Sequence, residues 1–550
     1  MGQPPGLKQI GRRKVLQAAG LAGAGFLLPA AFAATTARAG GGTTAAGIDE
    51  LVLCVDWQGG GPPLDMTRGP LADYQAFALS VALEGLLQID ENGMLQPGLA
   101  ESWSNPDPLT YVFRLRRGIR FWDGTPLTPE DVIYAFTRHR ERRWASNFAS
   151  AFPERFASID VSGEGEITFR LEEGYAHFAA VAATTPSYVV KAGFARAHVE
   201  DIGTSSVLTM GTGPFRIRRY VADDCIELVR NEHYWGAKPP IKRLVLKAIA
   251  DTESSLLALK AGEIDGSLYV PPRAADRWSA LANVGIIDYP SALCWWVAFD
   301  REVAPLGDIH VRRALAHGLD RRGLIEAVFR GRGRLAQTFA PPETWRRLLP
   351  ERETEAFYAS LPQNEFDLDR ARAELARSSV PRGFEITVPV EAMPEAEKIM
   401  QAWQAGLARI GVRMNLQSMS RNEYRAMVFR RTRRAGILLN RWGTEYPDPM
   451  WNPSATFTSD QALEGGWNLS NLRDATIDAL VRRSMAITDP AARASVIQDV
   501  LTRVAADAGF FFLFWPDQVV AFDERKVRVD SFVWWASMSS AWPRFLHPPR

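Results

Sequence analysis

An aromatic and acidic segment at residues 440–451 carries the side chains best suited to binding a small ligand. It reads Asn-Arg-Trp-Gly-Thr-Glu-Tyr-Pro-Asp-Pro-Met-Trp and contains the site candidates Trp442, Glu445, Tyr446 and Asp448. A carboxylate can pair with a cationic group, and aromatic faces can enclose an apolar one. The prolines on both sides of Asp448 fix φ and restrict the residues before them. The segment therefore predicts a stiff ligand-binding loop, and the alternative is a proline-rich turn whose aromatic residues pack for stability.

The residues before this loop predict how it is positioned. Gly436 precedes the apolar run Ile-Leu-Leu, which indicates a buried strand that leads into the loop. Upstream, residues 384–388 and 412–416 alternate apolar and polar side chains as strands do, whereas residues 399–410 place apolar side chains at helical spacing. A second helix near residues 422–431 completes a strand-helix-strand-helix-strand order, which predicts a parallel α/β sheet. Ligands of α/β sheets bind beyond the carboxyl ends of the strands, where this loop would lie.

The loop sequence Trp-Gly-Thr-Glu-Tyr-Pro-Asp-Pro resembles the ligand loop of the extracytoplasmic solute-binding proteins of family 5, the peptide and nickel import class. In its peptide-binding members, an aspartate at the position that matches Glu445 receives the α-amino group of the bound peptide. The residue here is a glutamate, one methylene longer, so the negative charge that pairs with an ammonium group is kept. The resemblance implies that Glu445 pairs with a ligand ammonium group.

Further stretches resemble the family in order along the chain. They are Leu-Ala-Glu-Ser-Trp at 99–103, Phe-Trp-Asp-Gly-Thr-Pro at 121–126, Gly-Thr-Gly-Pro-Phe at 211–215, Gly-Glu-Ile-Asp at 262–265 and Asn-Leu-Ser-Asn at 468–471. The resemblance implies an α/β fold of the two-lobed periplasmic binding protein kind, type II, with an extra subdomain and a hinge between the lobes. The implied parts are a lobe I core (48–81, 206–290 and 521–550), an inserted subdomain (82–205) and lobe II (291–520).

The resemblance also implies residues that border the ligand cleft. Trp57 follows the first strand, Trp295 and Trp296 lie where the chain crosses between lobes, and Asn468 lies in the Asn-x-Ser-Asn element. Adjacent residues of a strand point to opposite faces, so only one of the two neighbouring tryptophans can face the ligand.

We expect aromatic walls from Trp442, Tyr446, Trp467 and one of the pair Trp295 and Trp296. Three alternatives stay open for the remaining candidates: Trp57 in the core, Asn468 as an ordinary turn residue, and Asp448 as support for the turn between two prolines.

The N-terminal segment at 1–39 has the pattern of a targeting signal. Arg12, Arg13 and Lys14 precede a stretch rich in Gly, Ala and Leu, and Ala-Arg-Ala at 37–39 offers a cleavage site. Paired arginines before a weakly hydrophobic stretch predict a twin-arginine signal peptide, and the alternative is an ordinary secretory signal. Glycine and proline interrupt the stretch, which argues against a retained membrane anchor. We expect a periplasmic protein without a stable membrane anchor.

The composition limits the classes of function. The chain has 550 residues, a formal net charge of +1 and 46% hydrophobic residues, which is ordinary for a globular protein and offers no positive field for nucleic acid. Its three cysteines, Cys54, Cys225 and Cys294, are odd in number and far apart, so they predict no disulfide framework or metal site, although one bridge between two of them stays open. The seven histidines are scattered. We therefore expect no metal and no cofactor.

No nucleophile, zinc-enzyme or redox motif occurs in the chain, so we expect a binding protein rather than an enzyme. By resemblance, it captures di- or oligopeptides by cleft closure and delivers them, as a monomer, to an inner-membrane ABC permease. The alternative is the same receptor role for an oligosaccharide, an opine-like conjugate or a nickel complex, which the seventeen tryptophans keep open. An exported enzyme is the remote alternative.

Overall fold

The computed structural model describes residues 47–56, 63–68, 73–139, 156–431, 434–444, 446–533 and 542–549. The expected signal segment at 1–39 and two of the site candidates, Trp57 and Glu445, lie outside these residues. In the described part of the chain, no helix has both the length and the apolar character that crossing a membrane requires.

The first sheet has seven strands in the order β12-β19-β11-β1-β10-β9-β8. The strand β1 pairs in parallel with β10 and β11, and the other pairs are antiparallel. The strands are β1 (Ile48–Asp56), β8 (Phe215–Val221), β9 (Cys225–Arg230), β10 (Ile241–Ile249), β11 (Gly266–Val270), β12 (Val284–Tyr289) and β19 (Gln518–Asp523). Helices α5 (Thr252–Ala261), α6 (Ala275–Ser279) and η4 (Pro272–Ala274) connect β10 to β12.

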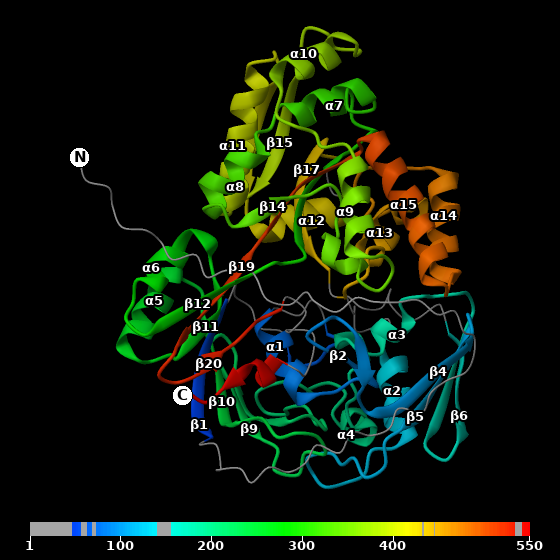
Figure 1. Cartoon of the computed structure of the whole chain (residues 1–550), viewed down its shortest axis with the longest axis vertical. Helices are drawn as coiled ribbons and strands as arrows, with labels where there is room; N and C mark the ends of the chain where they lie inside the picture. Colours follow the sequence, from blue (N-terminus) through cyan, green and yellow to red (C-terminus); the bar gives the residue numbers. More distant parts are fainter. Residues whose placement is uncertain are drawn as a thin grey trace, which may run out of the picture. The chain divides into compact units, whose positions relative to one another are not determined.

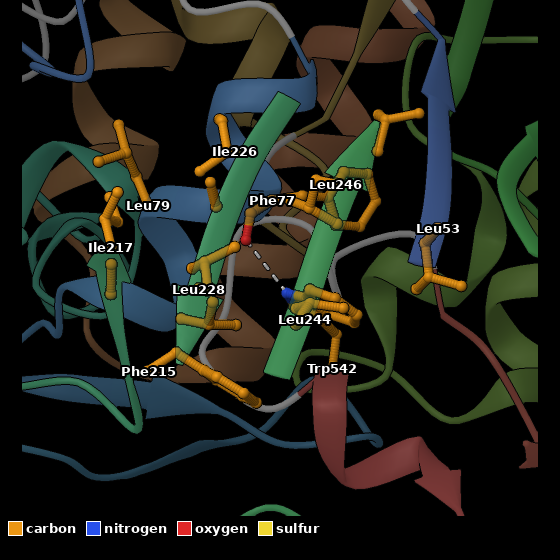
Figure 2. Packing of buried hydrophobic residues seen from close by; sticks show 14 of the residues in the cluster. Leu53, Phe77, Leu79, Phe215, Ile217, Ile226, Leu228, Leu244, Leu246 and Trp542 are labelled. Carbon is orange, nitrogen blue, oxygen red and sulfur yellow. Dashed lines mark hydrogen bonds between the residues drawn. The ribbon is translucent and has the colours of Figure 1, made fainter. Parts of the chain in front are cut away.

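The C-terminal segment completes the core of this sheet. Alternate residues of β9 and β10, such as Leu228 and Leu244, point to one face and are fully buried there. Helix α1 (Asp73–Ala82) packs on this face together with η8 (Trp542–Phe545) (Figures 1 and 2). The indole N–H of Trp542 donates to the carbonyl oxygen of Phe77 at 3.3 Å, and the two rings meet edge to face at 5.6 Å (Figure 2). The short strands β20 (Arg528–Val529) and β21 (Leu546–His547) pair beside it.

A second, antiparallel sheet has the order β4-β5-β7-β6. Tyr111, Phe113 and Leu115 alternate into its core, as their spacing predicts. The helix after them starts at a capping box, in which the backbone N–H and hydroxyl of Thr128 both donate to Asp131. The elements of this region are β2 (Leu87–Ile89), β3 (Leu95–Pro97), β4 (Ala100–Asp107), β5 (Thr110–Leu115), α2 (Pro129–Arg138), β6 (Phe156–Gly163), β7 (Glu166–Leu171), α3 (Phe178–Val181), η3 (Thr185–Ser187) and α4 (Ala192–Ala197).

A third sheet, β14-β18-β13-β17, is antiparallel throughout, and β15 and β16 form a separate parallel pair. The strands are β13 (Leu293–Phe299), β14 (Gly333–Leu335), β15 (Glu385–Glu391), β16 (Arg413–Met419), β17 (Ile437–Gly443) and β18 (Phe510–Pro516). The helices are α7 (Ile309–His317), α8 (Arg321–Phe329), η5 (Pro342–Trp345), α9 (Glu351–Ser360), α10 (Leu368–Ala376), α11 (Pro394–Ala408), α12 (Arg421–Arg430), α13 (Trp451–Thr456), η6 (Ser459–Gln461), α14 (Ala475–Ala486) and α15 (Pro490–Asp507). Helices α14 and α15 lie side by side (Figure 1).

The prediction of one parallel sheet over residues 384–441 is wrong for its last strand. The strands β15 and β16 do pair in parallel, but β17 pairs antiparallel with β13. This pairing continues as far as Trp442 and Gly443, so the strand extends into the segment that we expected to be loop. An alternation of strands and helices predicts the elements but not the distant partner that each strand takes.

The chain passes twice between the seven-stranded sheet and the β13 sheet. Residues 290–292 connect β12 to β13, and Asp517 alone separates β18 from β19. Gln518, in the range expected for lobe II, therefore already belongs to the seven-stranded sheet. The apolar run before it forms β18, which is buried throughout. The three cysteines are buried and form no disulfide.

Replacing Trp542 by alanine tests whether the C-terminal segment belongs to the core. The indole is completely buried, so its removal leaves a cavity, and we expect the free energy of unfolding to fall by about 3–5 kcal/mol. Urea unfolding followed by circular dichroism measures this loss. The control Phe366→Ala removes a ring that is 40% exposed and should lower the free energy of unfolding far less. Equal losses in the two variants would contradict this role of the segment.

Candidate ligand-binding site

The described site candidates divide into two groups around β17 and the loop after it. Trp295, Trp442 and Trp467 lie at or beside a small pocket. The side chains of Tyr446 and Asp448 are instead buried, in contact with residues of the β4–β7 region. The first backbone N–H beyond β17, that of Thr444, donates to the carbonyl oxygen of Ala292 at 3.3 Å. The start of the loop is thereby attached to the segment where the chain crosses between sheets.

The pocket has a volume of about 110 Å³ and lies beside β17. Several elements contribute to its lining, which includes Trp295 of β13, Glu391 of β15, Arg421 and Arg425 of α12, Asn440 and Arg441 of β17, and Trp467. Ligand pockets typically measure ~300–1,000 Å³. This pocket therefore has room for one group of a ligand rather than for a whole peptide.

Trp442 and Trp467 stack on one another beside this pocket. Their ring centroids are 4.0 Å apart and their planes are inclined by 20°. The ring of Phe429 of α12 meets that of Trp467 edge to face, with 4.6 Å between the ring centroids. Both indoles are half-buried, so each keeps part of its surface in contact with solvent. The structure thus brings together two tryptophans that the sequence predicts to be aromatic walls.

Neighbouring tryptophans of β13 point to opposite faces of the sheet, as alternation predicts. Trp296 is completely buried in the core, with its ring 5.0 Å from Phe339 and 5.9 Å from Phe510. Trp295 instead lines the pocket, where the guanidinium carbon of Arg441 lies 5.7 Å from its ring centroid. Of the pair, Trp295 is therefore the residue that a ligand in the pocket would contact.

Asp448 is the centre of a buried ion cluster. Arg493 of α15 donates to its two carboxylate oxygens at 2.6 and 3.0 Å, and Nε2 of His177 lies 3.1 Å from Oδ1. Burial by itself would raise the pKa of Asp448, but the positive charge of Arg493 and the contact with His177 hold that pKa well below its usual value. Both carboxylate oxygens are engaged, which is the arrangement expected of a residue that supports the turn. Its role toward a ligand stays a prediction.

Asn468 and Tyr446 are also buried. The amide group of Asn468 donates to the carbonyl oxygens of Thr458 and Leu472 at 2.9 and 2.7 Å, and its oxygen accepts the N–H of Leu472 at 3.0 Å. These bonds brace a turn, which is the alternative that the sequence leaves open. Tyr446 packs in the core of the β4–β7 region, and the guanidinium carbon of Arg347 lies 5.5 Å from its ring centroid. The ligand contacts of both residues remain predictions.

The sequence analysis did not identify the arginines of the pocket as site residues. Arg421 and Arg425 are four residues apart on α12 and so share one side of the helix, and Arg441 precedes a predicted site residue on β17. The net charge of the chain, +1, gives no sign of this local excess of positive charge. The spacing on the helix and the position next to Trp442 are the signals that were available.

No group of three His, Cys, Asp or Glu side chains in the described ranges is placed to hold a metal ion. The described pocket is lined by arginines and tryptophans, which are not the ligands that a metal prefers. The arrangement is suited to holding a planar or anionic group through aromatic faces and guanidinium groups.

Comparison with known proteins gives a consistent result. The model of the bacterial extracellular solute-binding proteins, family 5, matches residues 94–464, which is more than half of the chain. The chain is 27% identical to the heme-binding protein A of Haemophilus influenzae, over 73% of this chain and 75% of that protein. It is 26% identical to the probable D,D-dipeptide-binding periplasmic protein DdpA of Escherichia coli, over 78% of this chain and 80% of that protein.

A solved structure shows the same fold. The periplasmic binding protein DppA of Helicobacter pylori, in complex with the peptide STSA, aligns with a TM-score of 0.75 at 20% identity. The alignment covers 92% of this chain and 99% of that one. The two-lobed, mixed α/β architecture expected from the sequence is confirmed by this comparison.

The substitution Asp448→Asn tests the ion cluster, because it keeps the side-chain size and removes the charge. Loss of one partner of a buried pair typically costs ~3–5 kcal/mol, so we expect a lower urea midpoint at pH 7. The pKa of Asp448 is lower in the folded protein than in the unfolded chain, where it is about 4. The stability that the ionised carboxylate contributes is therefore complete above about pH 4 and is lost as the pH falls through the folded pKa. The difference in urea midpoint between the variant and the wild type should therefore shrink toward pH 2.

The matched control is Asp460→Asn, an exposed acid of η6 that should leave the midpoint unchanged at every pH. Circular dichroism at pH 7, 5, 3 and 2 gives the midpoints. An Asp448→Asn protein as stable as the wild type at pH 7 would show that the cluster does not stabilise the fold.

Proposed function

This chain belongs to the bacterial extracellular solute-binding proteins of family 5, and we propose that it is the substrate-binding component of an ABC importer for di- or oligopeptides. One observation carries the proposal: predicted ligand residues from distant segments, Trp295, Trp442 and Trp467, converge beside one pocket next to the crossing between two sheets. The matched range contains Trp295 and Trp442 and ends three residues before Trp467. The relatives include a probable dipeptide-binding protein, which supports a peptide as the solute.

The proposed mechanism is closure of the two lobes on the ligand. We assign lobe I to residues 48–81, 206–290 and 518–550, its inserted subdomain to 82–205, and lobe II to 291–517; β19 moves to lobe I because it pairs with β11 and β12. A ligand that contacts both lobes stabilises the closed state, which an inner-membrane permease then recognises. The protein acts as a monomer, without catalysis, in the periplasm.

In this proposal the ligand loop receives the amino end of the peptide. Glu445 pairs with the α-ammonium group, and this charge-assisted contact strengthens as closure expels water. Asp448 cannot serve this purpose without giving up its bonds with Arg493. The assignment of the ammonium group to Glu445 rests on the resemblance of this loop to that of the peptide-binding family members, and the engagement of Asp448 supports it.

A second candidate keeps the receptor role and changes the solute to an oligosaccharide, an opine-like conjugate or a metal complex. Two observations favour it. A heme-binding protein is among the relatives, and the stacked pair Trp442 and Trp467 offers an aromatic face that would suit a sugar or another planar group.

A thermal-shift screen of the purified protein separates these candidates. A ligand that binds only the folded state raises the melting temperature in proportion to RT ln(1 + [L]/Kd). We expect mixed peptides to raise it, the same peptides N-acetylated to have little effect, and oligosaccharides and nickel to have none. Glu445→Gln should abolish the response to free peptides, because an amide cannot replace the ion pair.

The control for this substitution is Glu464→Gln, an exposed acid 19 residues further along the chain that lines no described pocket. It should respond to peptides as the wild type does. A shift with oligosaccharides or nickel alone would refute the peptide proposal and favour the second candidate.

We also propose that residues 1–39 direct export by the twin-arginine route. Arg12 and Arg13 precede a weakly hydrophobic stretch, as such signals require. Replacing both by lysine should leave the precursor in the cytoplasm and lower the periplasmic amount more than tenfold, because this route depends on the arginine pair. Cell fractionation and immunoblotting measure the distribution. Unchanged export of the variant would indicate an ordinary secretory signal instead.

A further inference from the structure

We propose that a second pocket, between α5, η4 and α6 on one side and α8 and α11 on the other, binds a small phosphate-bearing anion. The four α-helices around it are labelled in Figure 1. This second pocket shares no lining residue with the pocket beside β17. Its occupancy therefore does not depend on which solute the protein transports.

The volume of the second pocket is suited to a small molecule. It measures about 330 Å³, against about 110 Å³ for the pocket beside β17. Ligand pockets typically measure ~300–1,000 Å³, so this one has room for a phosphate group and a small group attached to it. Its lining comes from elements far apart in sequence, from the start of α5 to the middle of α11. The pocket is therefore a product of the tertiary structure and not of one loop.

Positive charge is in excess in the lining. The side chains there that carry charge are Asp251, Glu253, Arg273, Arg277, Arg330 and Lys398. Arg277 of α6 forms an ion pair with Glu253 and donates to its Oε2 at 2.7 Å, so these two charges cancel. Arg273 of η4 pairs with Glu395 of α11 at 3.4 Å, which cancels a second positive charge.

Two cations remain without a partner. Within the described ranges, no ion pair or hydrogen bond engages the side chain of Arg330 or Lys398. The last acid, Asp251, accepts the N–H and the hydroxyl of Ser254 at 2.7 and 2.8 Å and thereby caps α5. Positive charge stays in excess even when this acid is counted. The two cations are therefore available to an anion.

Arg330 ends α8 in a conformation that suits glycine better. Its φ is 56°, in the left-handed region, where a side chain crowds the backbone and glycine does not. An interaction of the side chain can offset this strain, but the described part of the protein offers Arg330 no ion pair or hydrogen bond. A bound anion would supply that interaction.

The two free cations favour a phosphate group over a single carboxylate. A phosphate monoester carries a charge of about −1.5 to −2 at pH 7 and three acceptor oxygens, so one such group can engage both cations at once. The guanidinium fork of Arg330 can donate two parallel N–H···O bonds to it, and the ammonium group of Lys398 adds a point charge. A carboxylate has one negative charge and would leave the other cation unneutralised.

The second pocket adjoins the crossing between the two sheets. Two residues after Arg330, the carbonyl oxygen of Arg332 accepts the N–H of Asp517, the residue that separates β18 from β19. The guanidinium group of Arg332 pairs with Asp276 of α6 and Asp288 of β12, each at 2.9 Å. These ion pairs hold the end of α8 against elements of the seven-stranded sheet. An anion bound between the same elements would stabilise the same arrangement.

Isothermal titration calorimetry at low ionic strength, without peptide, tests the site. The probes are inorganic phosphate, pyrophosphate, glycerol 3-phosphate and succinate. We expect at least one of the three phosphate probes to bind about tenfold or more tightly than succinate, whose two negative charges belong to carboxylates. Tightest binding of phosphate or pyrophosphate would identify a free phosphate as the occupant, and tightest binding of glycerol 3-phosphate would identify a phosphate ester.

Two variants locate the binding. Arg330→Gly removes the side chain where φ suits glycine, and Lys398→Gln removes the second free charge, so each should weaken binding by about tenfold or more. The matched controls are Arg352→Gln on α9 and Lys260→Gln on α5, at exposed positions outside the pocket, which should bind as the wild type does. Melting temperatures without ligand verify that all four variants fold.

Each contrary outcome overturns a defined part of the proposal. Succinate binding as tightly as every phosphate probe would refute the phosphate class. Phosphate binding that is unchanged in Arg330→Gly and Lys398→Gln, or equally weakened in the two controls, would refute the location. Absence of binding by all four probes would refute the site. The peptide proposal is tested by the thermal-shift screen and stands or falls independently of these results.

Discussion

The double crossing between two sheets is the constraint on which the rest of the structure depends. The pair β12 and β19 belongs to one sheet, and the pair β13 and β18 continues the same two chain segments into the other. The hydroxyl of Ser291 donates to the carbonyl oxygen of Pro516 at 2.6 Å, which joins the two crossings to each other. Any motion of one sheet relative to the other must be absorbed in these few residues, which is the property of a hinge. Trp295, which lines the pocket, lies only three residues after the connection at 290–292. Motion at the crossing would therefore be transmitted directly to the site.

Charge is distributed in two contrasting ways around the ligand loop. Asp448 is buried and fully engaged by Arg493 and His177, so its charge is used inside the protein to fix the turn. An uncompensated charge in such a place would be strongly destabilising, which explains why the cluster is complete. Arg425 of α12 and Arg441 of β17 instead line the pocket, and no ion pair engages either of them in the described structure. The charge of Asp448 is thus neutralised inside the fold, whereas these two charges are not.

Local patterns in the sequence predicted the parts of the structure that depend on near neighbours. The opposite faces of Trp295 and Trp296 and the strands β15 and β16 follow from spacing along the chain. The pairing of β17 with β13 and the ion cluster around Asp448 were not predicted by such patterns. They depend on contacts between segments far apart in sequence, such as His177 with Asp448, 271 residues away, and no local pattern encodes them. The arginines of the pocket are an intermediate case, because their spacing on α12 and the position next to Trp442 are visible in the sequence but their convergence on one pocket is not.

The arrangement of charge also bears on the choice between a peptide and a neutral sugar. Arg425 of α12, Arg441 of β17 and Glu391 of β15 all line the pocket, so it contains charged groups of both signs. A zwitterionic peptide would pair with both kinds of group. A neutral oligosaccharide would stack on Trp442 and Trp467 but leave these charges without counter-charges when closure removes water, and unpaired charge in a desolvated site is costly. The aromatic faces therefore suit either kind of solute, whereas the charged groups beside them would favour a charged one.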